Sequence, residues 1–168
     1  NEFFGRKVMN GKILMVLTLV ISLGSLDAHA NLITNGDFET GDLSGWTTFT
    51  TPNGTIGSPS VSSSDVTGSG ASLAAVFNVG DILYPGNNGG GIFQMFNFGG
   101  GSLSVSIDVA TGTTISNVDA GEFSLLVNGL LVDFLDFGEI LEGTTERGTL
   151  SGVVNGLSAG QHELRVLM

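Results

Sequence analysis

The chain has 168 residues, and its five Lys and Arg residues stand against sixteen Asp and Glu, which gives a formal net charge of −11. A chain this acidic offers no basic surface for phosphates, which argues against nucleic-acid binding and against attraction to anionic membranes. Cysteine does not occur in the sequence, so disulfides, thiolate zinc sites and thiol nucleophiles are excluded.

The N-terminal segment has the three parts of a secretory signal peptide. Lys12 precedes an apolar run over 13–23, and Ala28-His29-Ala30 fits the small-x-small pattern of a signal-peptidase site. Eleven residues rise only about 16 Å as a helix, against roughly 30 Å for the hydrocarbon core of a bilayer. The segment therefore predicts export rather than a membrane anchor.

Three boundaries follow from this prediction. Residues 1–8 precede the first methionine, so we interpret them as upstream or incomplete sequence, and 9–30 as the signal peptide. The remaining 31–168 has 168 − 30 = 138 residues, a formal charge of 2 − 14 = −12, and no lysine. A chain of this length buries roughly two thirds of its unfolded surface, so we expect a single domain with one core.

Strand patterns dominate this mature chain, because apolar residues recur there at every second position. The hairpin signal Asn128-Gly129 separates two of these patterns. The alternating rows begin at Leu73, Leu103, Phe123, Leu130 and Leu164, and the shorter candidate strands are 31–33, 46–51, 92–98 and 147–154.

Two stretches rich in Ser, Gly and Pro, 51–70 and 84–91, are predicted to be surface loops. Many short strands separated by such turns predict an all-β fold, an antiparallel β-sandwich or jelly roll.

Several motifs resemble known proteins. The opening of the mature chain, NLITNGDFETGDLSGW over 31–46, resembles that of galactose-binding-like jelly rolls, including cellulose- and xylan-binding modules. Behind a signal peptide, this opening is similar to that of exported bacterial proteins of the PEP-CTERM type. The segments FSLLVNG, VDFLDFG and LSAGQHELRV, at 123–129, 132–138 and 157–166, resemble the same proteins.

This resemblance implies a secreted, non-enzymatic β-sandwich protein of the bacterial envelope or extracellular matrix. Proteins of this type end in a further strand and a sorting signal, so the resemblance also implies that the domain over 31–168 is truncated at its C-terminus. The alternative is a carbohydrate-binding module from a truncated polysaccharide-degrading enzyme, with a polysaccharide or cell-surface glycan as its partner.

The opening turn is a candidate calcium site. Asp37, Glu39 and Asp42 lie within six residues of one another, beside Asn35, and hard oxygen ligands in a glycine-bearing turn suit calcium. The resemblance implies that Glu39 helps to hold a structural calcium ion. The alternative, to which we give equal weight, is a turn whose Asp and Asn side chains cap local backbone groups.

Ligand binding would depend on amphipathic aromatic residues, because sugar rings stack on them. Trp46 and Tyr84 are the only Trp and Tyr of the chain, and both are candidate ligand-binding residues. Tyr84 lies in a predicted loop and is the better candidate, whereas Trp46 fits a core position. The phenylalanines mostly follow the strand alternation and are interpreted as core.

No catalytic residue is predicted. His162 is the only histidine of the mature chain, and the G-x-S-x-G motif of a nucleophile elbow does not occur. Glu139, Glu142 and Glu146 form an acidic set, but nothing in the sequence holds two of them across a bond as a glycosidase requires. We therefore expect a protein that is not an enzyme.

Overall fold

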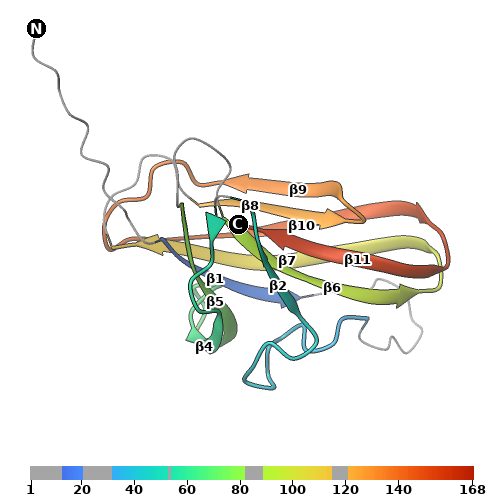
Figure 1. The fold of residues 1–168 in the computed structure, drawn as a ribbon, viewed down its shortest axis with the longest axis horizontal. Helices are drawn as coiled ribbons and strands as arrows, with labels where there is room; N and C mark the ends of the chain where they lie inside the picture. Colours follow the sequence, from blue (N-terminus) through green and yellow to red (C-terminus); the bar gives the residue numbers. More distant parts are fainter. Residues whose placement is uncertain (1–12, 21–31, 53, 82–88, 115–120) are drawn as a thin grey trace, which may run out of the picture.

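The computed structural model describes residues 13–20, 32–52, 54–81, 89–114 and 121–168. Within these ranges all regular elements are strands, and helices are absent, which confirms the prediction of an all-β fold. Consequently, no helix in the described part of the chain has the length and apolar character needed to cross a membrane. Figure 1 shows the long strands running along the longest axis of the molecule.

The strands form two sheets, and neighbouring strands pair antiparallel in both. The first sheet has the order β10 (Thr145–Leu157), β7 (Gly101–Thr113), β1 (Ile13–Val20), β5 (Ser72–Asp81) and β3 (Gly54–Thr55), and β4 (Ser60–Ser64) also pairs with β5. The second sheet has the order β2 (Thr47–Thr50), β6 (Gly90–Phe98), β11 (Gly160–Leu167), β8 (Glu122–Val127) and β9 (Leu130–Asp136).

The two sheets enclose one main core, as expected for a sandwich. The first sheet contributes the predicted rows of β5 and β7, and the second contributes the rows of β6, β8 and β11. The largest fully buried side chains are Phe38, Phe77, Phe123, Ile33, Ile92, Leu103, Ile107, Leu125, Ile140, Leu150 and Leu164. The alternation read from the sequence is therefore confirmed for these strands.

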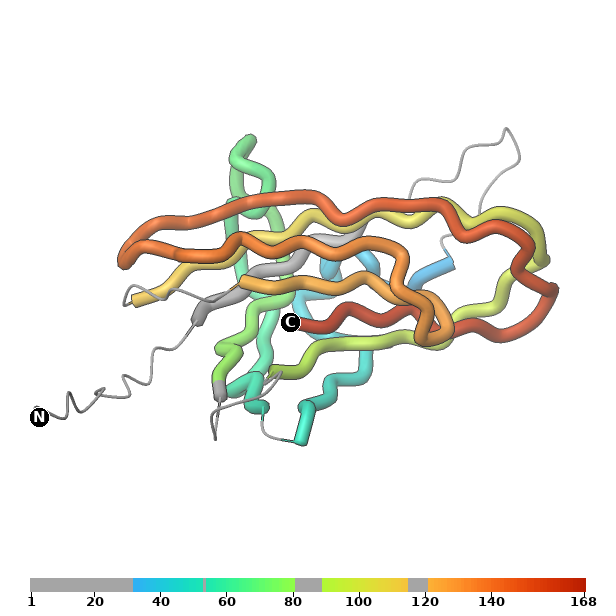
Figure 2. Tube along the Cα trace, turned by 90° about the horizontal axis from the view of Figure 1, so that it is seen from above, coloured from blue at the N-terminus to red at the C-terminus, as the bar shows by residue number. Residues whose placement is uncertain are grey.

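The hairpin between β8 and β9 turns where the sequence predicts. Asn128 and Gly129 have φ values of 52° and 76°, the left-handed conformation that a type I′ turn requires at both central positions. At the same end of the long strands, seen from above in Figure 2, the β10–β11 turn lies beside the β6–β7 turn. There a Cβ on Gly100 would lie 3.0 Å from the amide nitrogen of Ala159.

Two sequence predictions about short segments were wrong. Leu32 and Ile33 lie in bends instead of a strand. Their neighbour Thr34 obtains its backbone hydrogen bonds from the side chain of Gln94, at 2.6 Å to its amide and 2.9 Å to its carbonyl. The predicted loop over 51–70 contains the two short strands β3 and β4, which both pair with β5.

The segment predicted to be a signal peptide contributes strand β1. Its backbone pairs with β5 over five positions and with β7 over eight, in the middle of the first sheet. Removal of 1–30 by signal peptidase stays a prediction. Such a cleavage would leave β5 and β7 without a strand between them.

Candidate functional site

The opening loop, 32–46, is held together by one asparagine. The side-chain amide of Asn35 donates to the carbonyl oxygens of Asp42 and Ser44 at 2.8 and 3.2 Å, and its Oδ1 accepts from the Thr40 amide at 3.3 Å. Its backbone has a φ of 52°, a left-handed conformation that Asn tolerates better than most residues. Three backbone groups of the loop therefore depend on one side chain.

The carboxylates of this loop make similar local contacts. Oδ1 of Asp37 accepts from the Glu39 amide at 3.3 Å. Oδ1 of Asp42 accepts from the Thr40 hydroxyl at 2.7 Å and from the Ser44 amide at 3.0 Å. Hydrogen bonds from Thr40 first, and then from Ser44, hold the pKa of Asp42 below its ordinary value of 3.8.

These contacts bear on the predicted calcium site. Calcium takes six to eight oxygen ligands, whereas one oxygen each of Asp37 and Asp42 accepts a backbone amide proton within the loop. Among the described residues, no group of three or more Asp, Glu, His or Cys side chains gathers where it could hold a metal ion. The roles of Asp37 and Glu39 in holding calcium stay predictions.

The two aromatic candidates differ in what the structure describes. Trp46 is only 8% exposed, its indole N–H donates to the carbonyl of Asn35 at 3.0 Å, and its ring stacks on Phe38 with centroids 5.9 Å apart. This ring anchors the opening loop to the core. Tyr84 lies outside the described residues. A ligand-binding role for either residue stays a prediction.

His162 is enclosed by the second sheet. Its ring is 5% exposed and lies against Phe96 and Phe98, with centroids 5.8 and 6.3 Å away. Nε2 lies 2.9 Å from the carbonyl of Ser158, and Nδ1 lies 2.8 Å from the side-chain nitrogen of Asn128. Because a carbonyl only accepts and an amide NH₂ only donates, these partners fit a neutral ring with its proton on Nε2.

The acidic residues of β9 and the following turn also have structural surroundings. Asp133 accepts from the Ser151 amide of β10 at 2.8 Å, so it links the adjacent edges of the two sheets. Asp136 accepts from the Gly138 amide at 2.7 Å. Asp133 thus lies at a hydrogen-bonded site within β9, and Asp136 lies at the end of that strand. Glu139 and Glu146 are exposed.

A cluster on the outer face of the second sheet was missed by the sequence analysis. The Arg165 Cζ lies 4.5 Å from the Phe49 ring centroid and 5.2 Å from that of Phe93. The guanidinium also donates to both carboxylate oxygens of Glu163 at 2.8 and 3.1 Å. We call these four residues the Arg165 cluster. They lie on β2, β6 and β11, and the register places Phe93 directly opposite Arg165.

The interpretation of the phenylalanines as core is confirmed for Phe77, Phe96 and Phe123, which are buried. It was wrong for Phe134, which is 48% exposed, and for Phe93, which lies on the outer face beside Arg165. Phe93 and Arg165 are sequence neighbours of the inward-facing Ile92 and Val166. Strand alternation therefore predicts that both side chains face outward.

Comparison with known proteins found no matching protein-family model, no matching curated protein and no matching solved structure.

Proposed function

We propose that this chain is a secreted, non-enzymatic β-sandwich protein of the bacterial envelope or extracellular matrix, with a galactose-binding-like jelly-roll fold and PEP-CTERM-type export. The observation that carries the proposal is the three-part segment over 9–30 of a chain that folds into two antiparallel sheets, the first of which contains Ile13–Val20 of this segment. Such an N-terminal segment directs secretion, and an antiparallel sandwich is a common scaffold of exported proteins.

The contacts of the chemically capable side chains support a structural protein. Asn35 and Asp42 hold the opening loop, and Asp133 joins the edges of the two sheets. The buried His162 has a partner for each ring nitrogen and connects the start of β11 to the β8–β9 hairpin. Each of these groups contributes to the fold through its hydrogen bonds.

Export is tested by producing the full chain, with a C-terminal tag, in a Gram-negative host and measuring the mass of the product in each fraction. The proposal predicts an exported product that begins at Asn31. Replacing the small residues of the cleavage site, Ala28→Arg with Ala30→Arg, should leave the chain uncleaved. Ala71→Arg, at an exposed alanine outside this segment, is the matched control and should be cleaved normally. An intact chain confined to the cytoplasm would contradict the proposal.

The second candidate function is that of a carbohydrate-binding module, and the Arg165 cluster is the observation that favours it. Sugar-binding faces combine aromatic rings with charged groups that bind hydroxyls, and Phe49 and Phe93 supply rings beside a paired arginine. Retention of the protein on insoluble glycans tests this function. Phe93→Ala or Tyr84→Ala should reduce retention, and Val153→Ala, at an exposed residue of the other sheet, should not. Absence of retention would exclude the glycans used.

A further inference from the structure

The middle of the first sheet contains a slot one strand wide, between β5 and β7. β1 fills this slot, and its residues are antiparallel to both neighbours. Leu17 is paired with Ala75 on one side and Val109 on the other, and Thr18 is paired with Asp108. Since adjacent strands lie about 4.8 Å apart, β5 and β7 do not pair directly with each other while β1 lies between them.

The inner wall of the slot is apolar. Ala75 and Phe77 of β5 and Ile107 and Val109 of β7 are completely buried in the main core. The slot positions paired with them are 15, 17 and 19. An occupant therefore needs apolar residues at every second position, because a charged group there would be buried without a partner.

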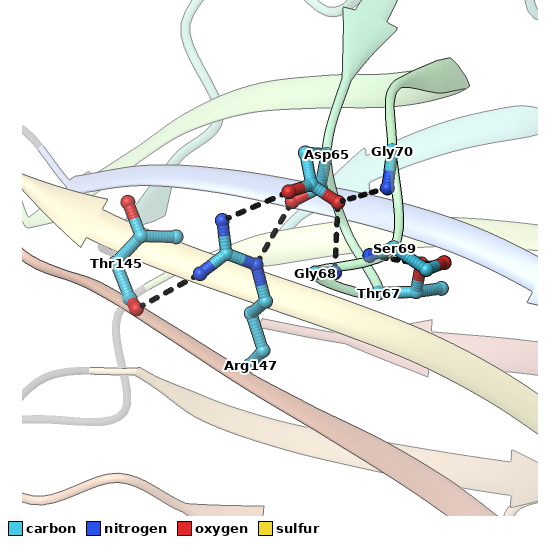
Figure 3. Close-up of polar contacts among 7 residues, drawn as sticks. All are labelled: Asp65, Thr67, Gly68, Ser69, Gly70, Thr145 and Arg147. Carbon is cyan, nitrogen blue, oxygen red and sulfur yellow. Dashed lines mark hydrogen bonds and ion pairs between the residues drawn. The ribbon is translucent and has the colours of Figure 1, made fainter.

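The outer side of the slot is covered by the loop after β4. Val66 of this loop is buried together with Ala74 of β5 and Ala110 of β7, so the loop reaches across the slot from one wall to the other. Figure 3 shows how the loop is held: the guanidinium of Arg147 extends from β10 toward Asp65. Arg147 Nε donates to the Asp65 carbonyl at 3.0 Å, and its Nη2 lies 3.6 Å from the Asp65 carboxylate.

This cover is further stabilised by the Asp65 side chain. Its Oδ1 accepts from the amides of Gly68 and Gly70 at 2.7 and 3.2 Å, so the loop keeps its shape through contacts with its own backbone (Figure 3). These bonds join the loop to itself and to β10.

We propose that the slot is a strand-binding site, and that the chain released by cleavage after Ala30 binds there an extended peptide with the chemistry of Ile13–Val20. The occupant is an uncharged segment of about eight residues with apolar side chains at alternate positions, antiparallel to both walls. The peptide is recognised by β-augmentation, because it pairs with the edges of β5 and β7 at once. Its backbone hydrogen bonds give affinity, and the apolar inner wall of the slot selects its side chains. This inference rests on the proposed export, because cleavage is what empties the slot.

Met168, the C-terminal residue, lies close enough to the slot for a strand linked to it to enter. Met168 exchanges backbone hydrogen bonds with Gly90 at 3.1 and 2.7 Å. A Cβ added to the neighbouring Gly89 would clash with the Met168 carbonyl and would lie 3.0 Å from a methyl group of Val79. Val79 is paired with Ile13, the first residue of β1. The end of β11 therefore lies beside the entrance through which β1 begins.

The test uses the full chain, folded intact, with a protease recognition sequence placed between Val20 and Leu32 and cut after folding. Gel filtration then shows whether the N-terminal fragment stays bound, and a fluorescent peptide of residues 13–20, flanked by lysines for solubility, measures exchange into the slot. Two peptides form a matched pair: Leu17→Lys places a charge opposite the buried wall, and Thr18→Lys places the same charge opposite Asp108.

The proposal predicts that the fragment stays bound after cutting and that the labelled peptide replaces it. The Leu17→Lys peptide should bind at least about tenfold more weakly than the Thr18→Lys peptide, since the residues paired with position 17, Ala75 and Val109, are completely buried and apolar, whereas position 18 is paired with Asp108, whose carboxylate offsets the lysine charge. Dissociation of the fragment without peptide binding, aggregation or dimerisation of the cut protein, or equal binding of the two lysine peptides would each overturn it. None of these results depends on whether cells cleave the chain, so export and strand binding are tested separately.

A second variant tests the slot without a free peptide. Residues 31–168, followed by a short Gly-Ser linker and then by residues 12–20, should fold with the stability of the full chain, because Met168 lies beside the slot entrance. The same protein with Leu17→Lys should lose that stability, and with Thr18→Lys it should keep it. Equal stability of the two lysine variants would contradict strand binding in the slot.

Discussion

Replacing Asn35 is expected to loosen the opening loop by a predictable amount. Asn35→Ala removes three side-chain hydrogen bonds to the backbone of Asp42, Ser44 and Thr40. Each is worth about 1 kcal/mol, and water replaces part of them at a half-buried site, so about 2 kcal/mol is lost. Ala also tolerates a φ of 52° poorly, which adds about 1 kcal/mol. Asn35→Gly loses the same bonds without this backbone cost.

The single tryptophan makes the assay specific to this loop. Trp46 stacks on Phe38 and donates to the Asn35 carbonyl, so its fluorescence reports on the loop during urea unfolding. We expect Asn35→Ala to be about 3 kcal/mol less stable than the natural chain, and Asn35→Gly about 2 kcal/mol less stable. Asn97→Ala, on the exposed face of β6, is the control and should change stability by less than about 0.5 kcal/mol. The reasoning would be refuted if both Asn35 variants unfolded at the same urea concentration as the natural chain. It would also be refuted if the Gly variant were less stable than the Ala variant.

Three further predictions concern acid, packing and calcium. Because the pKa of Asp42 is lowered in the folded protein, its carboxylate stabilises the fold above the ordinary value of 3.8, and this stabilisation is lost as the pH falls through the lowered pKa. In an acid titration followed by Trp46 fluorescence, Asp42→Asn should therefore show a smaller change than the natural chain. Phe123→Ala should cost about 3–5 kcal/mol in urea unfolding, and Phe134→Ala much less, because only Phe123 is fully buried. Calcium should raise the melting temperature of the natural chain but not that of Glu39→Ala; an unchanged melting temperature for both would dismiss the site.

Local pattern predicted most of the strands. Leu103, Val105, Ile107 and Val109 alternate without interruption, and they form one buried row of β7. Asn128-Gly129 set the β8–β9 turn because few other dipeptides adopt a positive φ at both positions. Such signals depend on neighbouring residues, and the sequence contains them directly.

Contacts between distant residues could not be predicted in this way. Thr34 takes its partner from Gln94, 60 residues away, and this contact replaces the strand pairing expected at 31–33. The Arg165 cluster likewise depends on the pairing of β6 with β11, which brings together Phe93 and Arg165. No local pattern specifies which strands become neighbours.

The apolar run over 13–23 shows a different limit. A short apolar segment without polar alternation has the composition of a signal-peptide core and also that of a strand buried on both faces. The sequence analysis predicted the first of these, and the structure places Ile13–Val20 as β1. One segment can have both properties when export and folding occur at different times, and the proposed strand-binding slot rests on that combination.

Cross-linking of the full chain tests most directly whether residues 13–20 lie between β5 and β7. Since the natural chain contains no cysteine, the pair Thr18→Cys with Asp108→Cys introduces two thiols at paired positions, within reach of a disulfide. Thr18→Cys with Ser104→Cys, four residues farther along β7 and about 13 Å away, is out of reach. Rapid oxidation of the first pair alone is the predicted result. Equal oxidation of both pairs, or of neither, would contradict the central place of this strand in the fold.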